Sequence, residues 1–431
     1  MAGEVLVEGH LARPMLVASQ QGQATSVLAL LRAGDVLQQL RFPLNFVLVL
    51  DRSFSMRGAS LQAVKDAVGL LIDTLTPHDY LAVVSFKGKA DVIVPAQQVS
   101  NKAAIKAAVD GMRAWGGTKM SEGLRGGLYE VSRNMRPDVV SRMVVLTDGR
   151  TSGDEAECRE LAEQARAWGV SIHALGLGGN VDEALLDEIG QRSGGRPAEF
   201  IQQPSDVLRV FQEQASGAAA VAVRNTVLTL RLPRGVLVRR AVRVLPILDD
   251  LGEAVLHGST AEVSLGDLER NATYGVLFEL LIEPRAAGQF RLAQLEAAYD
   301  IPLQGIKGER VRRDLAVTFV NDPAQANAVN EMVMGFAQRA NAQRLVRQAL
   351  DEYQRTGRTT VRMGQDVSAL LDEQTRQEMD RLAAGKVPAE QASVIMKGIY
   401  TRTRRMTEHV EGARPSGKDG GSSGRSPKKG T

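Results

Sequence analysis

The sequence predicts an α/β fold, in which a doubly wound, mostly parallel sheet is flanked by an antiparallel β-sandwich and a C-terminal helical section. Between about 44 and 216, short apolar stretches such as NFVLVL and RMVVL alternate with amphipathic ones such as SLQAVKDAVGLLIDTL. Strands that are apolar along their whole length are covered on both faces, as in parallel sheets with helices on either side. The segments before and after this region have the two-residue alternation of strands, and helical periodicity begins near 322.

Composition limits the possible functions. The 431 residues are too many for one hydrophobic core and predict two or three domains. A net charge of +3 and 4% aromatic residues do not favour nucleic-acid binding. The single cysteine, Cys158, cannot form an internal disulfide, and neither a secretory signal nor a run of 18 apolar residues is found. These features favour a cytoplasmic location.

The sequence pattern divides the chain into successive strands, helices and larger regions. EVLVEGHL, MLVASQ and ATSVLALLRAG are expected to be antiparallel strands that belong to the β-sandwich. In the α/β region, the apolar residues of the first helix, from Leu61 to Leu75, fall on one face. The expected divisions are N-terminal strands at 1–43, the α/β domain at 44–216, the sandwich at 217–321, a helical region at 322–410 and a disordered basic tail at 411–431.

The helical region should begin where Asp322 provides an N-cap and Pro323 the first helical position. Breaks are expected near Gly357 and near Pro388. Apolar residues recur at roughly helical spacing in this region, and they indicate either core packing or a surface for oligomerisation or docking. They are Met332, Phe336, Leu345, Leu350, Leu370 and Leu371.

Polar side chains gather at the ends of the predicted parallel strands. Asp51, Ser53 and Ser55 directly follow NFVLVL, Thr118 lies in a GGT loop between two predicted helices, and Asp148 directly follows RMVVLT. Ligands of such sheets bind outside the carboxyl ends of the strands. Two carboxylates and three hydroxyls are hard oxygen donors, which suit Mg²⁺ or Mn²⁺ and, less well, Ca²⁺.

The motifs DRSFS, GGT and LTDG, in this order, resemble the metal-ion-dependent adhesion site of von Willebrand factor type A (VWA) domains. The resemblance covers about 45–216. It implies that Ser53, Ser55 and Thr118 bind the ion through their hydroxyls, that Asp51 and Asp148 act largely through water, and that an Asp or Glu of a partner protein completes the site. It also implies that the last helix of the domain can shift when the site is filled. The whole layout resembles bacterial intracellular multidomain members that act as scaffolds.

The sequence departs from the usual motif around the site. Phe54 stands where a glycine is common, and it points either to a partner or into the core. Lys119 follows Thr118, while Arg52 and Arg57 flank the first loop, so we expect a basic rim that suits an acidic partner. Trp115 is close enough in sequence to line this rim.

Two kinds of function remain open at this point. The first is a non-enzymatic, metal-dependent protein–protein interaction module or scaffold, which we favour. The second is a metal-dependent phosphoester hydrolase, or a regulatory subunit of an enzyme complex. A haloacid-dehalogenase-like phosphatase needs a second aspartate where this chain has Ser53, and a receiver-type site needs an acidic pair that is missing.

Overall fold

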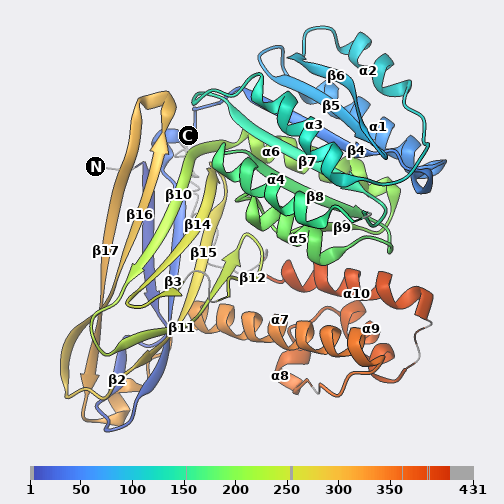
Figure 1. Cartoon of the computed structure of the whole chain (residues 1–431). Helices are drawn as coiled ribbons and strands as arrows, with labels where there is room; N and C mark the ends of the chain where they lie inside the picture. Colours follow the sequence, from blue (N-terminus) through green and yellow to red (C-terminus); the bar gives the residue numbers. More distant parts are fainter. Residues whose placement is uncertain are drawn as a thin grey trace, which may run out of the picture.

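The computed structural model describes residues 4–151, 153–252, 256–361, 363–385, 387 and 389–407. They form a central parallel sheet with helices on both faces, a β-sandwich and a C-terminal group of helices (Figure 1). The predicted fold class is therefore confirmed. Among the described residues, no helix has the length and apolar composition needed to cross a membrane.

Six strands form the central sheet in the order β6-β5-β4-β7-β8-β9, and β6 runs antiparallel to its neighbour β5. From β4 the chain proceeds outward to β5 and β6, then returns to the other side of β4 to form β7, β8 and β9. The strand order therefore reverses between β4 and β7, where ligands of doubly wound sheets bind. The bounds are β4 (Leu44–Asp51), β5 (Tyr80–Phe86), β6 (Ala90–Gln98), β7 (Val140–Thr147), β8 (Ser171–Leu177) and β9 (Glu199–Ile201).

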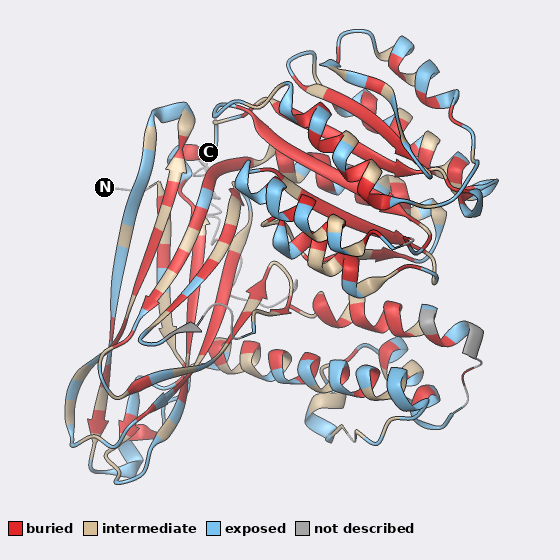
Figure 2. Ribbon diagram, in the orientation of Figure 1, coloured by how far each residue is buried: buried red, intermediate tan, exposed pale blue. Residues whose placement is uncertain are grey.

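Helices cover both faces of this sheet, which explains why β4 is apolar at almost every position. Val47 and Val49 pack towards α3, α4 and α5, whereas Phe46, Leu48 and Leu50 pack towards α1, α2 and α6. Figure 2 shows β4, β5, β7 and β8 as buried along almost their whole length and the helices as buried on one side, whereas the edge strand β6 is mostly exposed or half-buried. The helices are α1 (Ala59–Thr74), α2 (Lys102–Asp110), α3 (Met120–Ser132), α4 (Glu155–Ala167), α5 (Glu183–Arg192) and α6 (Val207–Ala219).

The β-sandwich combines strands from both sides of the α/β region. One sheet has the order β1-β3-β15-β11-β12 and the other β13-β14-β10-β16-β17-β2. The N-terminal strands are β1 (Val5–Leu11), β2 (Met15–Val17) and β3 (Gln23–Ala33). The later strands are β10 (Val221–Arg231), β11 (Val236–Leu245), β12 (Asp249–Asp250), β13 (Leu256–His257), β14 (Thr260–Glu269), β15 (Thr273–Ile282), β16 (Gly288–Ile301) and β17 (Ile306–Val320).

The C-terminal helices join the two other parts. Near its start, α7 buries Val333 and Phe336 against the sandwich, and further along it buries Val346 and Leu350 in the core of the α/β domain. A long helix therefore spans from one part to the other (Figure 1). The helices are α7 (Glu331–Thr356), α8 (Gln365–Ser368), α9 (Glu373–Ala383) and α10 (Ala389–Arg404).

Several details differ from the sequence-based expectations. The short β2 is parallel to β17, not antiparallel, because it pairs with the far edge of the sheet rather than with β1 or β3. Asp322 does accept a hydrogen bond from Ala324 N, but the turn it caps is a short 3-10 helix, and α7 begins only at Glu331. Helix α6 continues three residues beyond the expected boundary at 216. Pro388 and the tail at 411–431 lie outside the described residues.

Candidate metal centre

The centre of the site is Asp51, the last residue of β4. Its carboxylate is fully buried and accepts two hydrogen bonds, from Ser53 N at 2.7 Å and from Thr147 Oγ1 at 2.6 Å. Burial raises the pKa of Asp51 to about 6, although both hydrogen bonds act in the opposite direction and Asp148 adds a small further increase. The loop after β4 and the end of β7 thus hold this carboxylate from two sides.

A line of oxygen atoms runs outward from Asp51 to the surface. Ser53 Oγ lies 3.0 Å from Ser55 Oγ, and Ser55 Oγ donates to Asp148 Oδ1 at 2.6 Å. Ser53 is buried, Ser55 is exposed and Asp148 is half-buried. Burial raises the pKa of Asp148 above its ordinary value, and the hydrogen bond from Ser55 opposes this shift. Two carboxylates and two hydroxyls therefore face one another where β4 and β7 end.

Thr118 reaches the same place from the loop between α2 and α3. A Cβ atom added to Gly149 would lie 3.7 Å from Thr118 Oγ1 and 3.8 Å from Ser55 Oγ, so both hydroxyls approach this glycine. Backbone hydrogen bonds fix the loop, since Phe54 N donates to Gly116 O at 3.0 Å and Trp115 N donates to Arg52 O at 2.9 Å. The five predicted donors thus come from three loops that the fold brings together.

This set of donors fits a hard divalent cation. Carboxylate and hydroxyl oxygens are ligands that Mg²⁺ and Mn²⁺ accept, with water at the remaining positions. In the part of the chain that is described, no group of three or more His, Cys, Asp and Glu side chains is arranged to hold a metal ion. The mixed hydroxyl and carboxylate set at β4 and β7 is therefore the candidate that the donor chemistry supports.

Two residues that organise these loops were not among the predicted site residues. Thr147 belongs to an apolar strand, yet its hydroxyl holds Asp51. Asp154 stands at the N-cap position of α4, but its carboxylate accepts from Ser121 N, at the start of α3, at 2.7 Å and also bonds Thr151. The loop after β7 is thereby tied to the helix that follows Thr118. A polar residue at the end of a buried strand was the only available signal for Thr147.

The predicted rim residues differ in their surroundings. Phe54 points outward, being 60% exposed, and Trp115 is 68% exposed. The guanidinium of Arg57 lies over the Phe54 ring at 5.7 Å, and Lys119 is exposed. Arg52, in contrast, is largely buried and pairs with Asp91, so its charge is already compensated. Arg52 is therefore less exposed to a partner than Arg57 and Lys119 are.

A groove beside the site has aromatic and basic walls. Its volume is about 450 Å³, and none of its lining residues is acidic. Lys87, just outside it, stacks over the Trp115 ring at 4.7 Å. The aromatic, apolar and basic side chains that line the groove are Phe54, Arg57, Leu61, Lys65, Arg113 and Trp115.

Comparison with known sequences identifies the family of the α/β domain. Residues 45–214 match the family model of the von Willebrand factor type A domain. An uncharacterized protein of Synechocystis sp. is 35% identical over 269 residues, covering 62% of this chain and 63% of the relative. The uncharacterized protein YfbK of Escherichia coli is 26% identical over 175 residues, covering 39% of this chain and 30% of the relative. The chain thus spans less than two thirds of the length of either relative.

A solved structure has a similar architecture over nearly the whole chain. It is a von Willebrand factor type A protein from Catenulispora acidiphila, with a TM-score of 0.75 over 92% of this chain and 96% of that chain. The sequences are 18% identical, so the likeness concerns the fold. It extends beyond the α/β domain to the sandwich and the C-terminal helices.

Proposed function

Because residues 45–214 form a von Willebrand factor type A domain, a class of module that commonly mediates metal-dependent protein–protein interaction, we propose that this protein binds an acidic side chain of a partner protein through a divalent ion. The observation that carries the proposal is the line of oxygens from Asp51 through Ser53 and Ser55 to Asp148, placed where the strand order reverses. We propose no enzymatic activity.

Asp51, Ser53, Ser55, Thr118 and Asp148 would hold the ion, with Mg²⁺ or Mn²⁺ preferred over Ca²⁺. When bound, such an ion supplies a positive charge and an open position that a carboxylate can take. The residues of the chain supply the compensating charge and hold the ligand oxygens in place. The two carboxylates offset the charge of a divalent ion, and the buried hydrogen bonds of Asp51 hold its oxygens in place before binding, which lowers the ordering cost of binding.

The rim would select the partner. Arg57 and Lys119 attract an acidic segment, and their effect on the association rate should weaken with added salt. Phe54 and Trp115 offer exposed aromatic surface, which is common at the energetic centres of protein interfaces. The proposed partner therefore presents a carboxylate flanked by apolar and further acidic residues.

A pull-down with the full chain as bait tests this function. Bait is incubated with lysate of the source organism in Mg²⁺ and in EDTA, and retained proteins are quantified by mass spectrometry. We expect a partner that is retained only in Mg²⁺, is lost with Asp148→Ala and is reduced several-fold with Trp115→Ala. Tyr129→Ala is the matched control, because Tyr129 is 66% exposed but lies outside the groove. Equal retention in Mg²⁺ and in EDTA would contradict the proposal.

A further inference from the structure

A cavity of about 230 Å³ lies at the junction of the α/β domain and the β-sandwich. Its walls come from β7, α4, β8 and the loop before β9 on one side, and from β11, β14 and β15 on the other. The two parts approach closely here, since a Cβ atom added to Gly266 of β14 would lie 3.1 Å from Gly194 O. The amino ends of β7 and β8 contribute to it, so the cavity is at the opposite edge of the sheet from the candidate metal centre.

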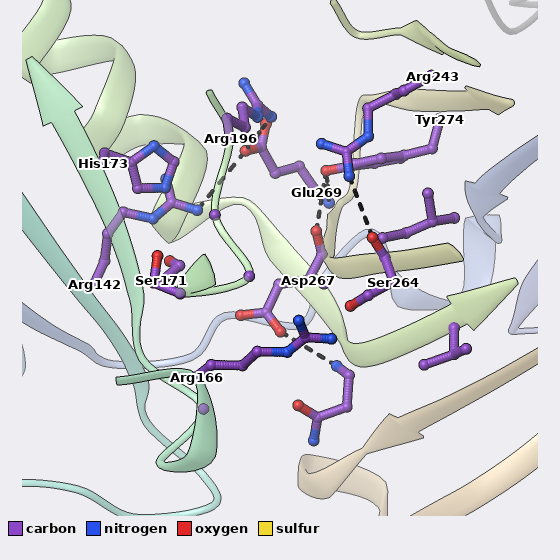
Figure 3. Close-up of a pocket in the computed structure, with 18 of the residues that line it drawn as sticks. Arg142, Arg166, Ser171, His173, Arg196, Arg243, Ser264, Asp267, Glu269 and Tyr274 are labelled. Carbon is purple, nitrogen blue, oxygen red and sulfur yellow. Dashed lines mark hydrogen bonds and ion pairs between the residues drawn. The ribbon is translucent and has the colours of Figure 1, made fainter. Parts of the chain in front are cut away.

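Four arginines line this cavity, and they enter from several directions. Figure 3 shows Arg142 and Arg243 on opposite sides, with Arg196 between them and Arg166 below. The lining includes two carboxylates, Asp267 and Glu269, and no lysine. With His173 neutral, the lining carries a charge of +2, because four guanidinium groups oppose two carboxylates.

The two carboxylates do not compensate all four arginines. Glu269 pairs with Arg196 at 2.9 Å and lies 3.9 Å from Arg142. Asp267 lies 3.7 Å from Arg224, an arginine outside the lining, and so is already engaged. Within the cavity wall, the positive charges of Arg166 and Arg243 therefore remain without a carboxylate of their own.

The surroundings of these two arginines support this account. The Arg166 guanidinium has no hydrogen bond or ion pair with any residue that the structure describes. Arg243 donates to Ser264 O at 3.2 Å, and the nearby Asp249 is paired with Arg404 at 3.4 Å. Burial lowers the pKa of Arg243 below its ordinary value, although Asp249 opposes the shift. Arg243 is half-buried, and a partly desolvated cation that meets mainly a backbone carbonyl is stabilised when an anion joins it.

Two buried N–H groups also lack acceptors. Arg142 Nε and Arg243 Nε are both buried and have no hydrogen-bond partner among the described residues. The Arg142 side chain is 7% exposed. Buried polar groups in folded proteins are nearly always paired, so these two donors in the cavity walls require an acceptor from water or from a bound ligand.

We propose that this junction cavity binds a small phosphate-bearing anion. The guanidinium fork matches the oxygens of a phosphate in two-point hydrogen bonds. A phosphate group carries about −1.5 to −2 charges at neutral pH, which offsets the +2 of the lining better than a single carboxylate does. An adjoining cavity of about 260 Å³ shares Arg142 and Arg196, so the rest of a phosphate ester has space next to the phosphate.

Such a ligand would link the two parts of the protein. Arg142 belongs to β7, and its terminal nitrogen also donates to Gln214 O of α6 at 2.8 Å, whereas Arg243 belongs to the sandwich strand β11. An anion held by both arginines bridges the domain that carries the metal centre and the domain that follows it. Binding should therefore stabilise the junction.

Titration of the full chain with inorganic phosphate and with pyrophosphate tests the proposal. Calorimetry and thermal unfolding are followed at constant ionic strength, with chloride as the balancing anion. The variants are Arg243→Gln and Arg166→Gln, and the latter also serves if the former does not fold, because Arg166 is exposed. Arg159→Gln is the matched control, since Arg159 lies on the same helix as Arg166 but pairs with Glu188 outside the cavity.

We expect the wild type to bind at least one of the two anions saturably at one site. Arg243→Gln should weaken this binding at least ten-fold and Arg166→Gln at least three-fold, whereas Arg159→Gln should change it less than two-fold. Binding should persist in EDTA and in Asp148→Ala, which separates this inference from the proposed metal function. The inference is overturned if the wild type binds neither anion saturably, or if both cavity variants bind as tightly as Arg159→Gln.

Discussion

Replacing Thr147 by valine removes one hydroxyl from the support of Asp51 and preserves the shape of the side chain. Thr147 and Asp51 are both fully buried, and their oxygens are 2.6 Å apart. The same hydroxyl also lies 3.2 Å from the amide nitrogen of Gly149, next to Asp148. The substitution therefore affects both carboxylates of the candidate centre without touching a proposed ligand.

The expected magnitude follows from the character of the lost hydrogen bond. A hydrogen bond to a charged group contributes about 1.5–3 kcal/mol, so we expect Thr147→Val to lower the free energy of unfolding by roughly 2–3 kcal/mol. Thr147→Ser keeps the hydroxyl and loses one methyl group, which costs about 1 kcal/mol. Loss of a residue that orients a metal ligand typically weakens metal binding by about 10–100-fold, and we expect this for the valine variant alone.

Urea unfolding in EDTA measures the stability of the two variants, and calorimetric titration with Mn²⁺ measures ion binding. In our account Thr147→Val is less stable than Thr147→Ser by roughly 1–2 kcal/mol and binds Mn²⁺ at least about ten-fold more weakly. Equal stability and equal ion affinity of the two variants would show that the Thr147 hydroxyl does not support Asp51.

Three further predictions concern other parts of the scaffold. Gly123→Ala should lower the free energy of unfolding by about 1–3 kcal/mol, because the new methyl would lie 2.5 Å from the Phe86 ring. Gly69→Ala should raise it by up to about 1 kcal/mol, because no atom lies within 4 Å of the new methyl. Urea unfolding that ranks the two variants alike would contradict this. Burial, followed by two neighbouring arginines, holds the pKa of His173 well below its ordinary value. The unfolded chain therefore takes up a proton below about pH 6.5 that the folded chain does not, so the free energy of unfolding should fall by up to about 1.4 kcal/mol for each pH unit of acidification. His173→Gln should remove this part of the pH dependence. Parallel stability profiles of the wild type and the variant would count against this role of His173. The Lys397 ammonium on α10 donates to two backbone carbonyls of the loop after β8. Lys397→Met should release α10 from this loop and so speed limited proteolysis of the C-terminal helices. Unchanged cleavage would exclude a role of Lys397 in holding α10.

The sequence predicted the parts of the structure that depend on local pattern. Asp51, Ser53 and Ser55 follow an apolar strand directly, and Asp148 follows another, so their position at strand ends could be deduced from the order of apolar and polar residues. The carboxyl ends of parallel strands share one edge of the sheet, which is why the predicted donors could be expected to meet. The structure places β4 beside β7 and brings these loops together.

Features that depend on partners distant in sequence could not be predicted. Arg52 resembled a free rim cation, but its partner Asp91 lies 39 residues away on β6. Asp154 has the position of a cap for its own helix, yet its carboxylate holds the start of another. The orientation of Phe54 was open, because an aromatic residue after a strand packs inward or outward according to what the neighbouring loop covers.

The parallel pairing of β2 with β17 is another feature that depends on partners distant in sequence. Three residues, Met15–Val17, carry too little pattern to specify a direction, and their partners are some 300 residues away along the chain. The arginine-lined junction cavity also could not be foreseen, because its lining comes from separate strands and helices of two domains. The pairing of strands distant in sequence depends on the packing of whole sheets, so a local motif does not specify it.

Calorimetric titration of the full chain with Mg²⁺ and Mn²⁺, for the wild type and Asp148→Ala, measures whether the site at β4 and β7 binds a divalent ion. We expect saturable binding of one ion per chain by the wild type and its loss in the variant, with unfolding temperatures in EDTA that differ little between them. Absence of saturable binding by the folded wild type, or equal binding by the variant, would contradict the assignment of this site to a divalent ion.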